Sequence, residues 1–153
     1  MSSHAELELV ILDFFSSPIE EVKSAASYAL GYLSLGNLQK YTPFILNKID
    51  TNSKRQYLLF NSLKEIISYQ SSHANGLQSL RPFINDIWNI LIKHCDCNGA
   101  ARNVVAECLE KLTLLDPNSL MPKLESYLDC PSSLARSTVV TATKFTITDQ
   151  VCF

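Results

Sequence analysis

The stretch that decides the fold is Glu20-Glu21-Val22-Lys23-Ser24-Ala25-Ala26-Ser27-Tyr28-Ala29-Leu30-Gly31-Tyr32-Leu33. Its apolar residues follow the i, i+3, i+4, i+7 spacing of one helix face, and they are Val22, Ala25, Ala26, Ala29, Leu30 and Leu33. Most of these side chains are small, so the face lets another helix approach closely but buries too little area to fold alone. We therefore predict a helix that packs between other helices.

The same pattern returns three times further along the chain. Lys23 aligns with Gln56, Arg102 and Arg136, at successive offsets of 33, 46 and 34 residues. Threonines replace apolar residues in the fourth copy, which is the weakest. Offsets of this size bracket the roughly 40–47-residue period of HEAT-type helical repeats. The sequence therefore predicts an all-α chain without strands, an α-solenoid of about four HEAT-type helix pairs.

Turn residues divide the chain into these pairs. We expect a HEAT-repeat segment over 1–149, with repeats at about 6–35, 38–70, 77–115 and 117–147, and a short tail at 150–153. Gly36 and Asn37 both suit the C-terminal cap of the second helix. A solenoid normally closes with a polar capping repeat. Because both ends here read as ordinary repeats, we expect them to expose apolar surface, as in a piece of a longer array.

Composition restricts the compartment and the partners. Hydrophobic residues make up 46% of the chain and charged residues 18%, which is typical of a globular protein. A net charge of −2 argues against a nucleic-acid partner. No apolar run reaches the ~20 residues that cross a bilayer, and the start lacks a signal peptide. The odd count of five cysteines argues against a disulfide framework. We expect a cytoplasmic and nuclear monomer with no membrane partner.

Catalytic chemistry has no recognisable pattern in this sequence. His94-Cys95-Asp96-Cys97 is the only metal-like cluster, and it lacks a second ligand pair at zinc-site spacing, so an ordinary surface turn is favoured. Neither His4 nor His73 belongs to a triad-like arrangement, and the four glycines are isolated. We predict a protein that is not an enzyme and that holds no cofactor and no metal.

Binding candidates come from positions expected to face outward. With the shared apolar positions turned inward, Tyr28, Tyr57, Phe60 and Lys64 point outward on the second helices of the first two repeats. The other outward positions are Ser24, Ser27, Gly31, Asn61, Asn103, Ala106, Glu107, Glu110, Ser137, Val140, Thr141 and Lys144. Outward aromatics beside a lysine suit an interface anchor. The alternative is that these aromatics pack on adjacent helices, because solenoid helices contact neighbours on more than one side.

Several of these stretches resemble one family over nearly the whole of 6–149. The matching segments are 22–31, 54–59, 62–67, 136–142, 144–147 and Arg102-Asn103-Val104-Val105-Ala106-Glu107-Cys108-Leu109. They resemble part of the C-terminal half of the cullin-associated, neddylation-dissociated proteins, also described as TATA-binding-protein-interacting proteins. The end, Gln150-Val151-Cys152-Phe153, departs from the family pattern.

The resemblance implies a function as well as a fold. Family members are long HEAT solenoids that wrap around unmodified cullin–RING scaffolds and promote exchange of substrate receptors. Attachment of the ubiquitin-like modifier to the cullin opposes their binding. The resemblance therefore implies a non-enzymatic regulator with a cullin–RING complex as partner and TATA-binding protein as a further one. It assigns no individual contact residue here. A generic HEAT adaptor, of the transport-receptor or phosphatase-scaffold type, is the alternative.

Overall fold

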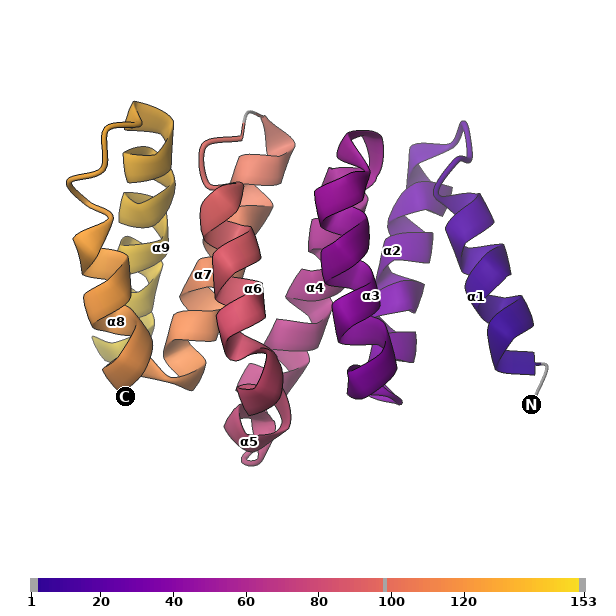
Figure 1. Cartoon of the computed structure of the whole chain (residues 1–153), viewed down its shortest axis with the longest axis horizontal. Helices are drawn as coiled ribbons and strands as arrows, with labels where there is room; N and C mark the ends of the chain where they lie inside the picture. The colour runs from indigo at the N-terminus through magenta and orange to yellow at the C-terminus, as the bar shows by residue number, and fades with distance from the viewer. Residues whose placement is uncertain (1–2, 98, 152–153) are drawn as a thin grey trace. The chain divides into compact units, whose positions relative to one another are not determined.

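Helices form all the regular elements in residues 3–97 and 99–151, which the computed structural model describes (Figure 1). The predicted all-α fold, built of successive helix pairs as in an α-solenoid, is confirmed. The elements are α1 (Ser3–Phe14), α2 (Glu20–Leu35), α3 (Leu38–Thr51), η1 (Ser53–Arg55), α4 (Gln56–Ser71), α5 (Gly76–Leu80), η2 (Arg81–Phe83), α6 (Ile84–Lys93), α7 (Ala100–Leu115), α8 (Pro117–Ser126) and α9 (Ser133–Val151). No helix among the described residues is long and apolar enough to span a bilayer.

The chain divides into two compact units, Met1–Ile66 and Ile67–Phe153, with the boundary inside α4. In the first unit α1 and α3 are drawn in front, with α2 and the beginning of α4 behind them (Figure 1). The helix α2 packs against both α1 and α3. The apolar core of this unit includes Ile11, Phe15, Ala26, Leu30, Tyr41, Ile45, Ile49, Leu59, Phe60 and Leu63. The small-residue stretch thus forms the centre of its unit.

Small residues allow α2 and α4 to approach closely. The Ser62 hydroxyl on α4 donates a buried hydrogen bond of 2.7 Å to the backbone carbonyl of Ser27 on α2. One turn further along α2, Gly31 is buried with no side chain to hold the two helices apart. A Cβ added there would lie 3.0 Å from the Ser62 carbonyl oxygen. The packing of α2 therefore depends on the small residues Ser27 and Gly31 as well as on apolar residues.

In the second unit α7 packs against α6, α8 and α9, and α8 also packs against α9. Its core includes Leu80, Ile87, Leu91, Val105, Leu109, Leu112, Leu120, Leu124, Val139 and Ala142. The Thr138 hydroxyl on α9 donates a 2.6 Å hydrogen bond to the carbonyl of Cys95, in the turn after α6. This buried bond ties the last helix to the α6–α7 turn.

The buried side of α2 differs from the predicted one. Ser27 and Gly31, which were expected outward, are buried, whereas Ala25 and Ala29, which were expected inward, are exposed. The reason is the contact with α4, which covers the Ser27 side of the helix. The same correction applies to Asn61 of α4 and to Ala106 and Glu110 of α7, which are also buried. The outward positions Ser137, Val140 and Lys144 of α9 are exposed as predicted.

Three boundaries also differ from those expected. Asn37 caps the N-terminus of α3, where its Oδ1 accepts from the backbone N–H of Lys40 at 3.1 Å, and does not cap α2. The first helix of the third pair is broken into α5, η2 and α6 around Pro82, which lacks a backbone N–H. The last helix continues through Val151, so half of the expected tail is helical, and Cys152 and Phe153 lie outside the described residues.

Candidate interaction surface

Three tyrosines of the first unit project from α2 and α4 with much of their area exposed. Tyr28 is 44% exposed, Tyr32 is 60% exposed and Tyr57 is 41% exposed. Tyr28 and Tyr32 lie one helical turn apart on α2, beside the exposed Ala29. Tyrosine supplies a large contact area and a polar hydroxyl, which is why it is enriched at protein interfaces. Sequence reasoning missed Tyr32, although its i+4 spacing from Tyr28 was a usable signal.

The four residues predicted as interface anchors differ in their exposure to solvent. Phe60 is 0% exposed, so its predicted outward orientation is wrong, and the packing alternative describes it instead. Lys64 is half-buried, whereas Tyr28 and Tyr57 are exposed. An aromatic side chain buried this completely stabilises its own fold and offers no surface to a partner. The binding role of Tyr28, Tyr57 and Lys64 stays a prediction.

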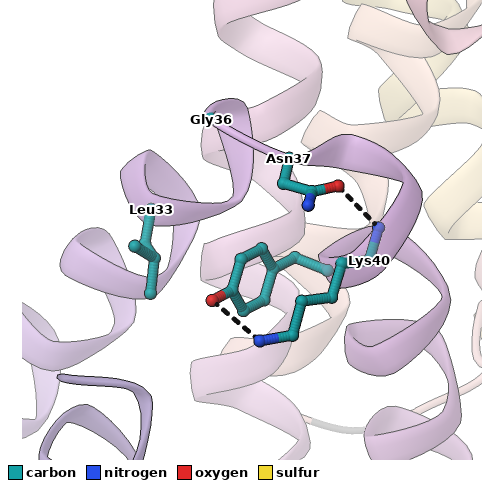
Figure 2. A pocket seen from close by; sticks show the side chains of 5 residues that line it. Leu33, Gly36, Asn37 and Lys40 are labelled. Carbon is teal, nitrogen blue, oxygen red and sulfur yellow. Dashed lines mark hydrogen bonds between the residues drawn. The ribbon is translucent and has the colours of Figure 1, made fainter. Parts of the chain in front are cut away.

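A hollow of about 280 Å³ lies where α2 turns into α3 (Figure 2). Its lining residues are Leu33, Gly36, Asn37, Lys40 and Tyr41. Figure 2 shows the side chain of Leu33 on one side of the hollow and those of Asn37 and Lys40 on the other. The lining is therefore apolar on one side, with an amide and an ammonium group beside it. Such a hollow suits an uncharged side chain of a partner protein.

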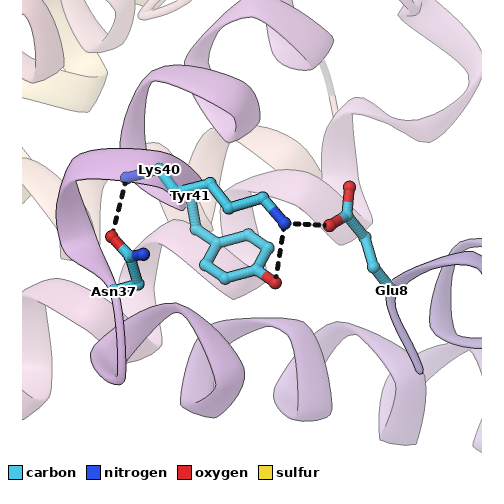
Figure 3. A network of polar contacts seen from close by, with 4 residues as sticks. All are labelled: Glu8, Asn37, Lys40 and Tyr41. Carbon is cyan, nitrogen blue, oxygen red and sulfur yellow. Dashed lines mark hydrogen bonds and ion pairs between the residues drawn. The ribbon is translucent and has the colours of Figure 1, made fainter. Parts of the chain in front are cut away.

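A polar network fixes the lysine of this hollow (Figure 3). The Nζ of Lys40 on α3 donates to the Oε2 of Glu8 on α1 at 2.6 Å and to the hydroxyl of Tyr41 at 3.2 Å. It also lies 4.5 Å from the centroid of the Tyr41 ring. The hydrogen bond that Lys40 donates to Glu8, and next the one that it donates to Tyr41, raise the pKa of Lys40 above its usual 10.5. Because Glu8 already neutralises the ammonium charge of Lys40, we do not expect this hollow to bind an anion.

Both cysteines of the turn at 94–97 have thiols of raised pKa. Burial is the largest cause that raises the pKa of Cys95 to about 11, and burial also raises the pKa of Cys97. A thiol of raised pKa stays protonated at neutral pH, whereas nucleophilic and metal-binding cysteines act as thiolates. Within the described parts of the chain, no three His, Cys, Asp or Glu side chains are grouped so as to hold a metal ion. His73 instead stacks on Tyr69, with ring centroids 4.0 Å apart.

The sequence is similar to parts of several much longer proteins of known name. It is 48% identical over 151 residues to cullin-associated NEDD8-dissociated protein 1 of Drosophila melanogaster and 44% identical over 151 residues to the protein of that name in Arabidopsis thaliana. It is 40% identical over 146 residues to cullin-associated NEDD8-dissociated protein 2 of Mus musculus. These alignments cover 98%, 98% and 95% of this chain. No family model matches the sequence.

The same alignments cover only a small part of each relative. The chain spans 12%, 12% and 11% of the length of these three proteins. Identity of this level over nearly the whole chain confirms the family resemblance seen in the repeat motifs. What a complete relative does is therefore a basis for proposals about this chain.

Proposed function

From its kinship with the cullin-associated NEDD8-dissociated proteins, we propose that this chain is a non-enzymatic scaffold segment that binds a cullin–RING complex. The alignment over 98% of the chain carries the proposal. The names of the relatives describe association with a cullin and dissociation linked to NEDD8. We therefore expect this segment to prefer the unneddylated cullin, and to contribute to substrate-receptor exchange as part of a complete scaffold.

The exposed tyrosines of the first unit are the proposed contact residues. Tyr28 and Tyr57 keep more than two fifths of their area exposed, so each has surface to bury against a partner. Lys64 lies two turns after Tyr57 on α4 and adds a positive charge. Aromatic residues and a nearby cation form the type of cluster that dominates many protein interfaces. The hollow beside Tyr41 supplies a recess for an uncharged side chain of the same partner.

The experiment is a quantitative pull-down of this chain with an unmodified cullin–RING complex and with its neddylated form. We expect retention of the unmodified form and loss of the neddylated one. Tyr28→Ala and Tyr57→Ala should each weaken binding several-fold, within the range for interface tyrosines. Tyr69→Ala is the matched control, because Tyr69 lies on the same helix as Tyr57 and is equally exposed, at 41%.

Each outcome of the pull-down has a distinct meaning. If the chain binds neither form while its circular dichroism stays helical, cullin recognition does not lie in this segment, and the generic HEAT adaptor becomes the better description. If binding survives both tyrosine substitutions, the contact surface lies elsewhere on the chain. Retention of TATA-binding protein in the same assay would add the second partner that the family suggests. Residence in cytoplasm and nucleus, which this function requires, is tested by imaging the tagged chain.

A further inference from the structure

A small recess opens in the first unit, at the edge where α1 turns into α2 and α3 turns into α4. Both turns lie at the same end of this unit (Figure 1). The recess has a volume of about 50 Å³ and is lined by Leu12, Phe15, Lys48, Asn52, Arg55 and Leu59. A single water needs about 10–15 Å³, so a group of a few heavy atoms fits. All six lining residues belong to the first unit, so their arrangement is that of one compact body.

The recess combines buried apolar residues with basic residues that reach solvent. Phe15 is 3% exposed and Leu59 is 2% exposed, and Leu12 is half-buried beside them. Lys48 is exposed and Arg55 is half-buried. A ligand that fits both parts therefore has an apolar stem and a negatively charged end.

Arg55 is held in place by a bond that leaves most of its donors available. Its Nη2 donates to the hydroxyl of Ser16 in the α1–α2 turn, the one side-chain hydrogen bond that Arg55 makes to the described residues. Its backbone N–H donates to the carbonyl of Asn52 at 3.2 Å. A guanidinium carries five N–H donors in a rigid fork, and such a fork binds a carboxylate through two parallel hydrogen bonds. Arg55 is thus positioned for a carboxylate before any ligand arrives.

Neither cation of the recess pairs with a carboxylate of the described residues. Lys48 instead lies 5.6 Å from the centroid of the Phe44 ring, and Arg55 bonds an uncharged hydroxyl. The ion pairs within the described parts of the chain are formed by other lysines, such as Lys40 with Glu8. Because two positive charges flank the same recess, an anion between them is attracted by both. The missing negative charge is therefore one that a ligand can supply.

We propose that this recess binds a glutamate side chain from an acidic segment of a partner protein. The glutamate carboxylate accepts hydrogen bonds from Arg55 and Lys48, and its methylene groups lie against Leu12 and Leu59. A phosphate group fits less well, because the apolar part of the lining offers no donors to its remaining oxygens. The inference names the chemistry of the partner segment and does not depend on cullin binding.

NMR titration of the whole chain with a short capped peptide of three consecutive glutamates, at one fixed ionic strength, tests the inference. The signals of the Arg55 Nε–H and of the Leu12 and Asn52 amides should shift and saturate. The same peptide with glutamines should leave them unchanged. Arg55→Gln should weaken binding roughly tenfold, as expected for losing a hydrogen bond between charged groups. Lys48→Gln should weaken it by a smaller factor, because an exposed lysine forms weaker ion pairs.

The control is Lys54→Gln, which removes the same charge one residue before Arg55, outside the recess lining, and should bind as the native chain does. Circular dichroism verifies that each variant folds. If Arg55→Gln unfolds, the exposed Lys48 decides the test alone. Native affinity in the folded recess variants would overturn the proposal, and so would an equal loss in Lys54→Gln. Saturation by inorganic phosphate without any response to the glutamate peptide would also overturn it, since the recess would then be a site for free anions.

Discussion

Gly31 of α2 lies directly against Glu65 of α4: a Cβ added at position 31 would be 2.8 Å from the Cβ of Glu65. This glycine has an ordinary helical place in the middle of α2, so its role is the close approach of two helices. Gly36, at the end of the same helix, has no neighbour closer than 3.4 Å to an added Cβ. We therefore expect the same substitution to change stability differently at the two glycines.

Gly31→Ala should destabilise the first unit by about 1–3 kcal/mol, the usual range for overpacking a well-packed contact. In a solvent-exposed helix interior the same change would stabilise by up to about 1 kcal/mol, so the sign is diagnostic. Urea unfolding measured by circular dichroism checks it. Gly36→Ala is the matched control and should be neutral or slightly stabilising. A stabilised Gly31→Ala chain would show that α2 and α4 are not in close contact.

Phe60→Ala should destabilise the fold by about 3–5 kcal/mol, because it removes a fully buried aromatic side chain and leaves a cavity. Tyr57→Ala, three residues earlier on α4, should have a much smaller effect, since Tyr57 is 41% exposed. Thermal unfolding of the two variants side by side measures the difference. Equal losses of stability would contradict the assignment of Tyr57 to the surface and Phe60 to the core.

Thr138→Val should destabilise the second unit by about 1–3 kcal/mol, because it leaves the buried Cys95 carbonyl without its 2.6 Å hydrogen bond. The substitution conserves shape, so the loss reports the hydroxyl. Thr141→Val is the control: its hydroxyl bonds only the Ser137 carbonyl of its own helix, at 2.8 Å on the surface. Chemical denaturation of both variants provides the comparison. A Thr138→Val chain as stable as the control would show that the hydrogen bond to Cys95 does not stabilise the second unit.

Raising the pH should weaken the fold between pH 9 and about 11 through Cys95. Burial raises the pKa of this thiol from 9.0 to about 11, so the folded chain keeps a proton that the unfolded chain releases. The stability that the neutral thiol contributes is fully present below pH 9 and is lost as pH rises through 11. Melting curves across this range should show a smaller decline for Cys95→Ala than for the native chain. Parallel declines would refute the assignment.

Glu8→Gln should lower the pKa of Lys40 toward its ordinary value of 10.5, because the hydrogen bond to Glu8 is the largest cause of its elevation. NMR titration of the lysine side-chain carbons detects the change. Glu20→Gln is a suitable control, since Glu20 pairs with Lys23 at 2.6 Å and not with Lys40. An unchanged Lys40 titration in Glu8→Gln would mean that the α1–α3 ion pair does not persist in solution.

The helix pattern was readable from the sequence because local spacing determines it. Apolar residues at helical spacing predicted helices, and helices are what the described residues form. His94-Cys95-Asp96-Cys97 was expected to form a surface turn; it does form a turn, but Cys95 is buried in it, and that burial raises the pKa of its thiol. The ion pair of Lys40 was not foreseen, because its partner Glu8 is distant in sequence.

By itself, the sequence determined the helical class, the repeated helix pairs and the family resemblance, since each follows from local spacing or from the order of matching residues. The tertiary structure decided which sides of the second helices are buried. A 3.6-residue period identifies one apolar face, but a helix between two neighbours buries a second side that needs only small residues, as Ser27 and Gly31 do against α4. For the same reason Ala29 and Val140, which the repeat pattern cannot distinguish from their buried equivalents, are exposed because no helix among the described residues covers them.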